Sequence, residues 1–490
     1  MSAPLDPFGS VINIGGLSLR TPGLAGEAEY FPPGAVGMRA VEETSNEFEA
    51  ALAKQQIETQ HVIEIREARE VSVPGVATRS APLGEVAMEL EVPDPGDGWG
   101  QIVLYTDESG TMTWHFARNE NGQPDVSRGA ATRTYLIPRA VSESGGNGKS
   151  RGLIGAIGKK LFKVLVFPLV DPIIGKIGEF FAHRWEVKHR AYRVRTFTSD
   201  NYSTENCPNF SENDWSWMSG GRALLMIHGT LSRTPIAFGA LSKPCVESLH
   251  RKYNGRVFAF DHFTLSEDPK QNIEAFLRLM PDRLLLDLDV ICHSRGGLVA
   301  RQLAERQGHF SLGSRKIQVN RIVFVAVPNS GTILADTQYM GDFIDSYTNL
   351  INFFPDNGVT ETLEGILTIV KQLAVDTVKG LEGLQSMLPA GSFLQHLNQG
   401  GSKDKQYFAL ASNFEPAVLG WKSYAADHLM DKIFKSENDL VVPTVGVYDR
   451  NGADLFPIQD RHVFGPEDGV PHTGFFGNDI VQQKIVGWLS

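Results

Sequence analysis

Apolar residues follow two different patterns along the chain, and the change falls between residues 200 and 220. Beyond it, short runs that are apolar on both faces alternate with stretches of helical periodicity, as in a parallel sheet covered by helices. The expected strands are residues 223–227, 256–260, 284–291, 322–327 and 406–411, and the expected helices are residues 236–252, 271–279 and 479–489. The pattern predicts a mostly parallel α/β domain over residues 201–490.

Residues 46–141 show the alternation that is typical of half-buried strands. A short helical stretch over 48–56 comes first, and hairpin-type turns such as PDPGDG and DESG separate the runs that follow. The expected strands are residues 61–65, 86–92, 101–106, 111–116 and 134–137. We predict a small antiparallel β domain here, of the sandwich type. Residues 1–45 are rich in glycine and proline without periodicity, so we expect a loosely ordered arm or an edge that docks on another part of the structure.

The segment between these regions, residues 142–200, is strongly basic. Residues 149–195 contain 11 Lys and Arg against 3 Asp and Glu, a local +8 that leaves −19 for the rest of a chain of net charge −11. Helical spacing over residues 153–165 predicts a basic amphipathic helix. We favour a connector helix that packs on the next domain with its lysines in solvent; the alternative is peripheral contact of 149–195 with an anionic membrane. The lysines of the polar face are Lys159, Lys160 and Lys163.

Composition narrows the class of protein. With 490 residues, 42% hydrophobic and 21% charged, the chain is globular rather than disordered or membrane-embedded. The net charge of −11 argues against a nucleic-acid partner. The three cysteines, Cys207, Cys245 and Cys292, are too few and too widely spaced for a disulfide framework or a zinc site. No signal peptide or membrane-spanning run is evident, so we expect a cytoplasmic protein, peripheral to a membrane if the basic segment binds one.

The sequence DVICHSRGGLVAR, residues 289–301, carries the strongest chemical signal. A buried strand runs directly into a helix through a turn centred on Ser294. Such a turn projects the hydroxyl clear of the backbone and directs the amides of the following helix at developing negative charge. Small residues are needed two positions away on either side: Gly296 supplies one, and Cys292 replaces the usual other glycine. We predict that Ser294 is the nucleophile of an α/β-hydrolase fold.

A second motif completes the expected oxyanion hole. The strand at 223–227 ends in His228, Gly229 and Thr230, where lipases and esterases place an oxyanion loop. The backbone N–H groups of Thr230 and Arg295 would then bind the oxyanion. We expect a structural role for the His228 side chain, because the mechanism uses the amides of its loop.

A nucleophilic serine needs a base and an acid that orients it, which follow the serine in the order acid, then His, in this fold. Asp439, in SENDLVVP, and His472, in GVPHTGFF, are the predicted acid and base. The alternatives are Asp460 and Asp468 for the acid and His462 for the base. No metal-ligand cluster such as His-Glu-x-x-His is present, so we expect neither a metal nor another cofactor.

The ordered landmarks of residues 220–490 resemble lipase-like α/β-hydrolases, including the bacterial lipase and GPI-inositol-deacylase-like groups. The resemblance rests on LLMIHGT, VICHSRGGLVAR, FVAVPNSGT, MLPAGSFLQHLN, ENDLVVP and GVPHTGFF. It implies the same nucleophile, acid, base and oxyanion amides, and it implies that residues 333–398 are an inserted helical cap. No resemblance covers the first two hundred residues.

The insertion also has a pattern of its own, because residues 343–354 and 363–374 form helices with broad apolar faces. A cap of this kind over the sheet would create an apolar pocket suited to an acyl chain. We therefore expect a serine hydrolase of lipase or esterase type that acts on hydrophobic, lipid-like carboxylic esters through an acyl-enzyme. The alternatives are a membrane-active phospholipase or toxin-like effector that uses the basic segment, and a non-enzymatic interaction protein on a hydrolase scaffold.

Overall fold

The computed structural model describes residues 1–32, 46–71, 86–107, 110–118, 131–139, 158–169, 181–336, 339–353, 355, 358–374, 381–399, 404–415, 436–450 and 457–489. Much of the predicted connector, residues 142–157 and 170–180, lies outside these ranges, as do residues 33–45 of the predicted arm. The contacts divide the chain into two compact units. One unit is Met1–Phe181 with Ile366–Val378, and the other is Ala182–Gly365 with Lys379–Ser490.

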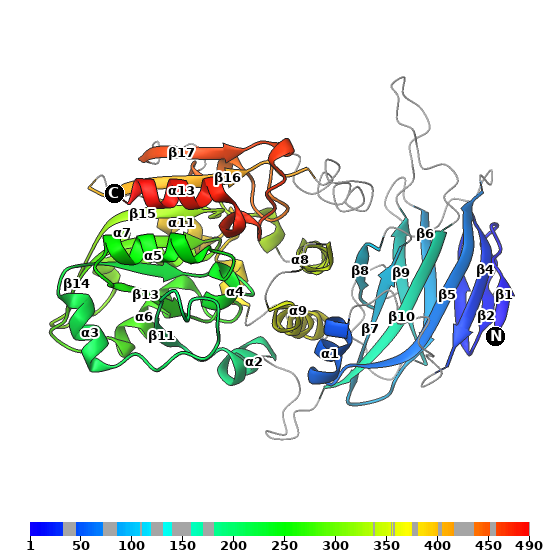
Figure 1. Cartoon of the computed structure of the whole chain (residues 1–490). Helices are drawn as coiled ribbons and strands as arrows, with labels where there is room; N and C mark the ends of the chain where they lie inside the picture. The colour runs from blue at the N-terminus through cyan, green and yellow to red at the C-terminus, as the bar shows by residue number, and fades with distance from the viewer. Residues whose placement is uncertain are drawn as a thin grey trace. The chain divides into compact units, whose positions relative to one another are not determined.

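Two antiparallel sheets form most of the first unit (Figure 1). The larger one, as far as the chain is described, has the strand order β1-β4-β5-β10-β7-β8, and the smaller one has the order β2-β3-β6-β9. The strands are β1 (Ser2–Pro4), β2 (Ile12–Ile14), β3 (Leu17–Arg20), β4 (Leu24–Phe31), β5 (Glu58–Glu70), β6 (Val86–Pro93), β7 (Trp99–Thr106), β8 (Met112–His115), β9 (Thr132–Arg139) and β10 (Gly158–Pro168).

The two sheets share one apolar core, as in a sandwich. Leu19, Leu90 and Ile137 of the smaller sheet are fully buried in the same cluster as Ile63 and Phe162 of the larger sheet. The strands predicted within residues 46–141 are all present, and the short helix before them is α1 (Asn46–Lys54). The sandwich is larger than predicted, because its strands begin at Ser2 and end at Pro168.

The prediction of a loosely ordered arm is wrong for the described part of residues 1–45, which contains β1 to β4. The first three of these strands are only three or four residues long, and positive-φ glycines such as Gly15 and Gly23 turn the chain between them. Strands this short show no periodicity. Their positions are fixed by pairing with later strands, β3 with β6 and β4 with β5.

The predicted basic helix is also wrong where it is described, because Gly158–Pro168 is a strand between β5 and β7. A continuous apolar run such as residues 164–167 fits a buried strand as well as a buried helix, and periodicity alone does not separate the two. Two lysines of this segment form ion pairs within the first unit. Nζ of Lys163, which is buried, lies 2.9 Å from Glu49 of α1, and Nζ of Lys159 lies 3.2 Å from Glu64.

Helix α9 (Val359–Ala374) continues from the second unit into the first, which includes its residues from Ile366 onward. Its Lys371 is 8% exposed and donates a hydrogen bond of 3.0 Å to the carbonyl oxygen of Gln55. The ammonium group also lies 5.0 Å from the ring centre of Phe181. Burial lowers the pKa of Lys371 from 10.5 to about 8.

This lowered pKa makes the stability of the first unit depend on pH. Between pH 8 and 10.5 the unfolded chain binds a proton at Lys371 that the folded chain lacks, so the free energy of unfolding should rise with pH in that window. Below pH 8 the cost of burying the charge, at most about 3 kcal/mol, is present in full. Lys371→Met should lack this rise. Denaturant titrations at pH 7 and pH 10 measure it, with the exposed Lys188→Met as the control. Equal pH slopes in wild type and Lys371→Met would show that the lysine is not buried in this way.

The second unit is built on a sheet with the order β11-β13-β12-β14-β15-β16-β17. Every neighbouring pair is parallel except β11, which runs antiparallel to β13. Such a mostly parallel sheet is consistent with the expected α/β-hydrolase fold. The strands are β11 (Arg193–Thr196), β12 (Arg222–Ile227), β13 (Val257–Asp261), β14 (Leu285–His293), β15 (Lys316–Val325), β16 (Gln406–Ser412) and β17 (Ile458–Phe464).

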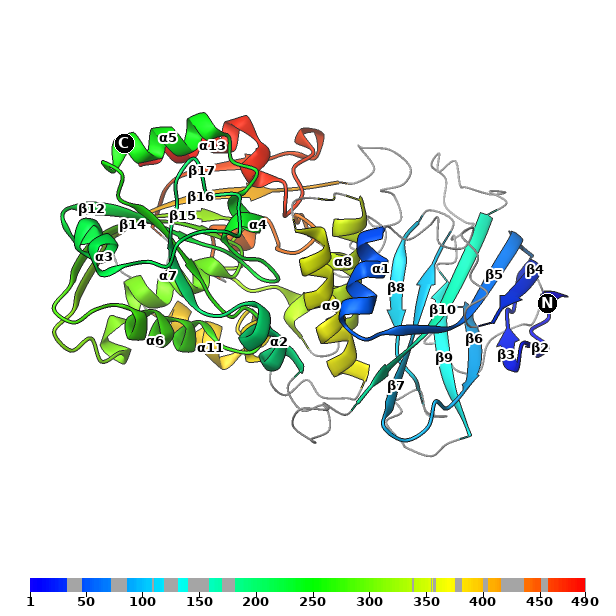
Figure 2. The ribbon, with the colours of Figure 1, turned by 60° about the horizontal axis from the view of Figure 1, so that its bottom comes forward.

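Helices cover both faces of this sheet. Figure 2 shows α5 and α13 on one side and α6 and α11 on the other. Within the described ranges no helix is both long enough and apolar enough to cross a membrane. The helices are α2 (Phe181–His189), α3 (Glu212–Ser219), α4 (Thr234–Phe238), α5 (Lys243–Lys252), α6 (Pro269–Leu279), α7 (Gly296–Glu305), α8 (Met340–Phe353), α10 (Glu382–Gln385), α11 (Ser392–Asn398) and α13 (Asp479–Trp488).

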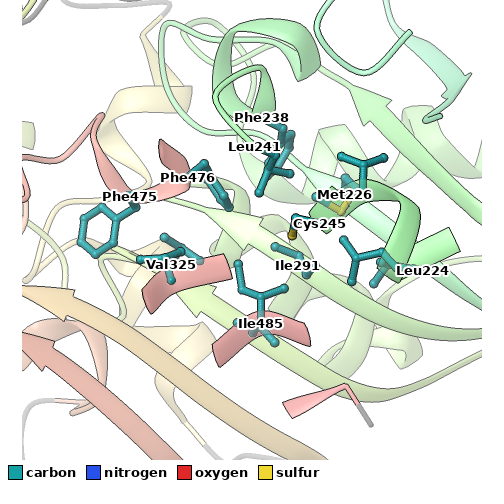
Figure 3. Packing of buried hydrophobic residues seen from close by; sticks show 14 of the residues in the cluster. Leu224, Met226, Phe238, Leu241, Cys245, Ile291, Val325, Phe475, Phe476 and Ile485 are labelled. Carbon is teal, nitrogen blue, oxygen red and sulfur yellow. The ribbon is translucent and has the colours of Figure 1, made fainter. Parts of the chain in front are cut away.

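A dense apolar core fills the space between the sheet and the helices α5 and α13 (Figure 3). Met226 and Ile291, from β12 and β14, are fully buried there and meet Cys245 of α5 and Ile485 of α13. This core fixes the ends of the central strands, from which the candidate site is built.

The strands predicted for residues 201–490 are present, as are the helices at 271–279 and 479–489. The helix predicted over 236–252 is wrong in one respect, since it is broken into α4 and α5. The break has a local cause: the hydroxyl of Ser242 accepts the backbone N–H of Cys245, and Pro244 lies in the first turn of α5.

Candidate active site

Ser294 lies in the tight turn between β14 and α7. Its backbone has a φ of +51°, which is uncommon for a residue with a Cβ. Two hydrogen bonds hold this conformation, from Ser294 N–H to the carbonyl of Val325 at 2.9 Å and from Gly297 N–H to the carbonyl of Ser294 at 2.9 Å. A strained strand-to-helix turn of this kind is typical of the nucleophile position in α/β-hydrolases.

Close packing explains the residue types on either side of the turn. A Cβ on Gly296 would lie 2.3 Å from the carbonyl oxygen of His228 and 2.6 Å from that of Ile227. On the other side, Cys292 is fully buried in β14 and its thiol donates to the carbonyl of Val323 at 3.4 Å. The strand therefore accommodates Cys292 where the motif usually has glycine, whereas position 296 has no space for a side chain.

We expect Gly296→Ala to destabilise the second unit by about 3 kcal/mol or more, because its methyl group would meet backbone atoms that cannot move aside independently. Gly308→Ala is the matched control, since a Cβ there meets nothing within 4 Å. Chemical denaturation of the two variants measures the difference. If Gly296→Ala were as stable as Gly308→Ala, the close approach at this turn would be wrong.

The predicted nucleophile, base and acid form one chain of hydrogen bonds. Nε2 of His472 lies 3.0 Å from Oγ of Ser294, and Nδ1 of His472 lies 2.8 Å from Oδ2 of Asp439. Each of the three residues is 1% exposed. A carboxylate only accepts hydrogen bonds, so Nδ1 carries the proton and Nε2 is left to accept the hydroxyl proton of Ser294.

The loops that carry Asp439 and His472 are tied to each other and to the end of β16. The second carboxylate oxygen of Asp439 accepts the backbone N–H groups of Val441 and Val442 at 3.0 and 2.7 Å. The backbone N–H of His472 donates to the carbonyl of Asp439 at 3.0 Å. The hydroxyl of Ser412, at the end of β16, donates to the carbonyl of Val470 at 2.7 Å. These bonds orient the carboxylate and the imidazole before any ligand binds.

The structure does not bring the alternative acids and base into this chain. Asp460 is exposed and accepts the indole N–H of Trp488 at 2.8 Å. Asp468 accepts the backbone N–H of Gly465 at 2.8 Å. His462 lies on β17 with its ring centre 4.5 Å from that of Phe464.

The predicted oxyanion amides flank Ser294. A Cβ on Gly229 would lie 2.6 Å from the Cβ of Ser294, so the loop after β12 directly contacts the serine turn. Among the described residues, no acceptor binds the backbone N–H of Thr230 or of Arg295. Two free amides beside a serine hydroxyl are suited to bind an oxyanion. His228 is neutral, because burial lowers its pKa to about 4, and its Nε2 accepts the backbone N–H of His262 at 3.1 Å.

A pocket leads to these groups. Leu231, Ile236 and Ile351 provide apolar walls, and Thr230 and His472 also line it. It contains about 450 Å³ of space between atoms, including open solvent at its mouth. The pocket therefore places apolar surface next to the hydroxyl–imidazole pair. The described residues include no group of three or more His, Cys, Asp or Glu side chains that could hold a metal ion.

A family model described as a domain of unknown function, DUF7379, matches residues 189–490, more than half of the chain. The chain belongs to the DUF7379 family. The matched region contains β11, every later strand and all five residues predicted for the site. No curated protein matches the sequence.

The DUF7379 chain is also similar, at low identity, to solved structures of lipases and esterases. Lipase 1 from Pelosinus fermentans is 13% identical with a TM-score of 0.37, over 55% of this chain and 97% of the lipase. The metagenomic carboxyl esterase MGS0156 is 14% identical with a TM-score of 0.33, over 58% and 78%. Phospholipase PlaB from Legionella pneumophila is 15% identical with a TM-score of 0.32, over 54% and 56%.

Two side chains at the DUF7379 site were missed by sequence reasoning. The guanidinium of Arg295 is fully buried and donates to the carbonyls of Gly383 and Phe263 at 2.7 and 3.3 Å, and also to that of Glu267. Burial lowers its pKa to about 10, so it stays charged at neutral pH. Tyr347 of α8 lines the pocket beside His472. The sequence pattern assigned Tyr347 only to an apolar helix face, and no local signal places its hydroxyl.

Proposed function

We propose that this chain is a serine hydrolase that cleaves carboxylic esters with hydrophobic groups through an acyl-enzyme. The observation that carries the proposal is the continuous hydrogen-bonded chain Ser294–His472–Asp439, with the serine in a positive-φ turn between strand and helix. The pocket beside it supports a hydrophobic substrate.

In the proposed mechanism His472 accepts the hydroxyl proton as Oγ of Ser294 attacks the acyl carbon. Asp439 holds the imidazole in the tautomer that can accept this proton and stabilises the imidazolium that forms. The amides of Thr230 and Arg295 bind the oxyanion. Protonated His472 then donates its proton to the leaving alcohol, and water resolves the acyl-enzyme by the same steps.

The buried side chain of Arg295 supports this arrangement. Its bonds to the carbonyls of Phe263 and Gly383 join the serine turn to the loop after β13 and to α10. The carboxylate of Glu186, also buried, accepts the backbone N–H groups of Leu265 and Ser266 at 2.9 and 3.0 Å in that same loop. These bonds hold the amide of Arg295 in place while charge develops, which a preorganised oxyanion site requires.

Within the predicted cap at 333–398, helix α8 is proposed to contribute to the acyl pocket, because its Tyr347 and Ile351 line the pocket together with Leu231 and Ile236. At the start of α9, Glu361 pairs with Arg190 at 2.8 Å and also with Arg233. This end of the cap is therefore tied to the hydrolase unit by buried or partly buried charges.

Hydrolysis of a series of p-nitrophenyl esters tests the proposal. The wild type should turn over esters of acetate to octanoate in metal-free buffer, and longer acyl chains should lower KM until the pocket is full. Absence of turnover, together with no reaction towards a serine-directed phosphonate, would instead favour an interaction protein on a hydrolase scaffold.

A further inference from the structure

Tyr347 lines the same pocket as His472 and Thr230, next to the proposed nucleophile. It lies in the middle of α8, is 4% exposed, and its ring meets that of His472 edge-on with the centres 6.4 Å apart. A second ring, that of Phe343, lies 4.8 Å away and fixes its orientation. The side chain of Ser294 is close enough to the phenol to lower the pKa of Tyr347 slightly, against the larger effect of burial.

The direction of a hydrogen bond between the Tyr347 and Ser294 hydroxyls would follow from their neighbours. Oγ–H of Ser294 donates to Nε2 of His472, so Oγ has only lone pairs left to offer, and the phenol must be the donor. Burial and the negative charge of Asp439 both raise the pKa of Tyr347. The phenol therefore keeps its proton at any neutral pH and can act only by donating it in a hydrogen bond.

During attack Oγ of Ser294 becomes a poorer acceptor for this donor. Oγ forms a bond to the acyl carbon, its proton moves to Nε2 of His472, and the π electron pair of the carbonyl moves to the carbonyl oxygen. The lone pairs that remain on Oγ are only weakly basic. Leaving a buried hydrogen-bond donor without an acceptor costs about 1–3 kcal/mol of free energy. The strongest acceptor that appears within the pocket is the oxyanion, next to Thr230, which lines the same pocket as Tyr347.

We propose that Tyr347 is a catalytic residue supplied by the inserted helices. Its hydroxyl donates to Oγ of Ser294 in the free enzyme and to the oxyanion in the tetrahedral intermediate, as a third donor beside the two backbone amides. No proton leaves Tyr347 in either step. The inference rests on the proposed ester hydrolysis and adds to it a donor that belongs to α8 rather than to the hydrolase core.

Tyr347→Phe tests the inference, because it removes one oxygen and keeps the ring contacts. We expect kcat on p-nitrophenyl butyrate to fall about 10²-fold with KM changed less than about threefold, since the lost bond is made only in the transition state. A trifluoromethyl ketone, which forms an oxyanion adduct with serine, should bind more weakly by a similar factor. Tyr339→Phe, in the half-buried turn just before α8, is the matched control and should match wild type.

Changing the leaving group separates this role from others. An oxyanion donor acts on the acyl oxygen, so the loss in Tyr347→Phe should be equal for p-nitrophenyl and ethyl esters. A loss that is larger for ethyl esters would assign the hydroxyl to the leaving group and overturn the inference. Wild-type kinetics and wild-type ketone affinity in the variant would also overturn it while leaving the proposed function intact. An inactive wild type that forms no ketone adduct would refute the proposed function itself.

A second substitution covers the case in which Tyr347→Phe does not fold. Incorporation of 3-fluorotyrosine at position 347 keeps the hydroxyl and makes it a stronger donor. The ketone adduct should then be bound severalfold more tightly than by wild type. Unchanged affinity would contradict a hydrogen bond from this hydroxyl to the oxyanion.

Discussion

Replacing Ser294 by alanine is expected to lower kcat for ester hydrolysis by about 10⁵-fold or more, with the folded structure unchanged. Among the described residues no other hydroxyl pairs with Nε2 of His472, so none of them is placed to take over the attack. The amides of Thr230 and Arg295 can still bind substrate, and a small residual rate should remain. Initial rates on p-nitrophenyl butyrate, with circular dichroism as a check of folding, measure the effect.

Ser219→Ala is the matched control, because its hydroxyl bonds only to the carbonyl of Ser216 at the exposed end of α3. This variant should retain wild-type activity. Activity of Ser294→Ala within tenfold of wild type would assign any hydrolysis to another nucleophile.

Asp439→Asn is expected to lower kcat by about 10⁴-fold through the tautomer of His472. One carboxylate oxygen accepts the N–H groups of Val441 and Val442, so the amide oxygen of an asparagine would take that place and its NH₂ group would face Nδ1. Nδ1 would then have to accept, Nε2 would carry the proton, and the imidazole could not deprotonate Ser294. Steady-state kinetics at neutral pH measures this loss.

Asp460→Asn removes the same charge from the alternative acid and is the control for the Asp439 variant. Its carboxylate is exposed and binds Trp488 and Lys484, away from the imidazole. We expect activity within about twofold of wild type. Loss of activity in Asp460→Asn, with Asp439→Asn unaffected, would reverse the assignment of the acid.

Much of the candidate site could be predicted from the sequence because its parts are local signals. The turn at Ser294 is encoded by a buried strand, a small residue and a helix within thirteen positions, and the acid and base follow in the expected order. Asp439 and His472 lie far from Ser294 along the chain. Only their order in the sequence therefore indicated that the three side chains would lie together in the fold.

The errors have a common physical cause, which is pairing between distant segments. The sequence of β10 predicts a helix, because its neighbours β5 and β7 lie about 60 to 100 residues earlier and no local pattern shows that they pair with it. The short strands β1 to β3 were missed for the same reason. The break between α4 and α5 differs, because Ser242 followed by Pro244 was a readable helix start.

Side-chain contacts that depend on tertiary packing could not be predicted from the sequence either. The guanidinium of Arg295 finds its carbonyl partners on two other segments of the chain. Tyr347 lies beside His472 because α8 lines the same pocket as the loop that carries the histidine. The motif at 289–301 points to the backbone amide of Arg295, but no local pattern shows where its guanidinium or the side chain of Tyr347 lies.

Covalent labelling by a fluorophosphonate, followed by peptide mapping, tests the central claim most directly. The wild type should gain one phosphonate, on the peptide that contains Ser294, and Ser294→Ala should gain none. His472→Ala should label far more slowly than wild type, because nothing then accepts the hydroxyl proton. Equal labelling of wild type and Ser294→Ala, or no labelling of either, would contradict the assignment of Ser294 as the nucleophile.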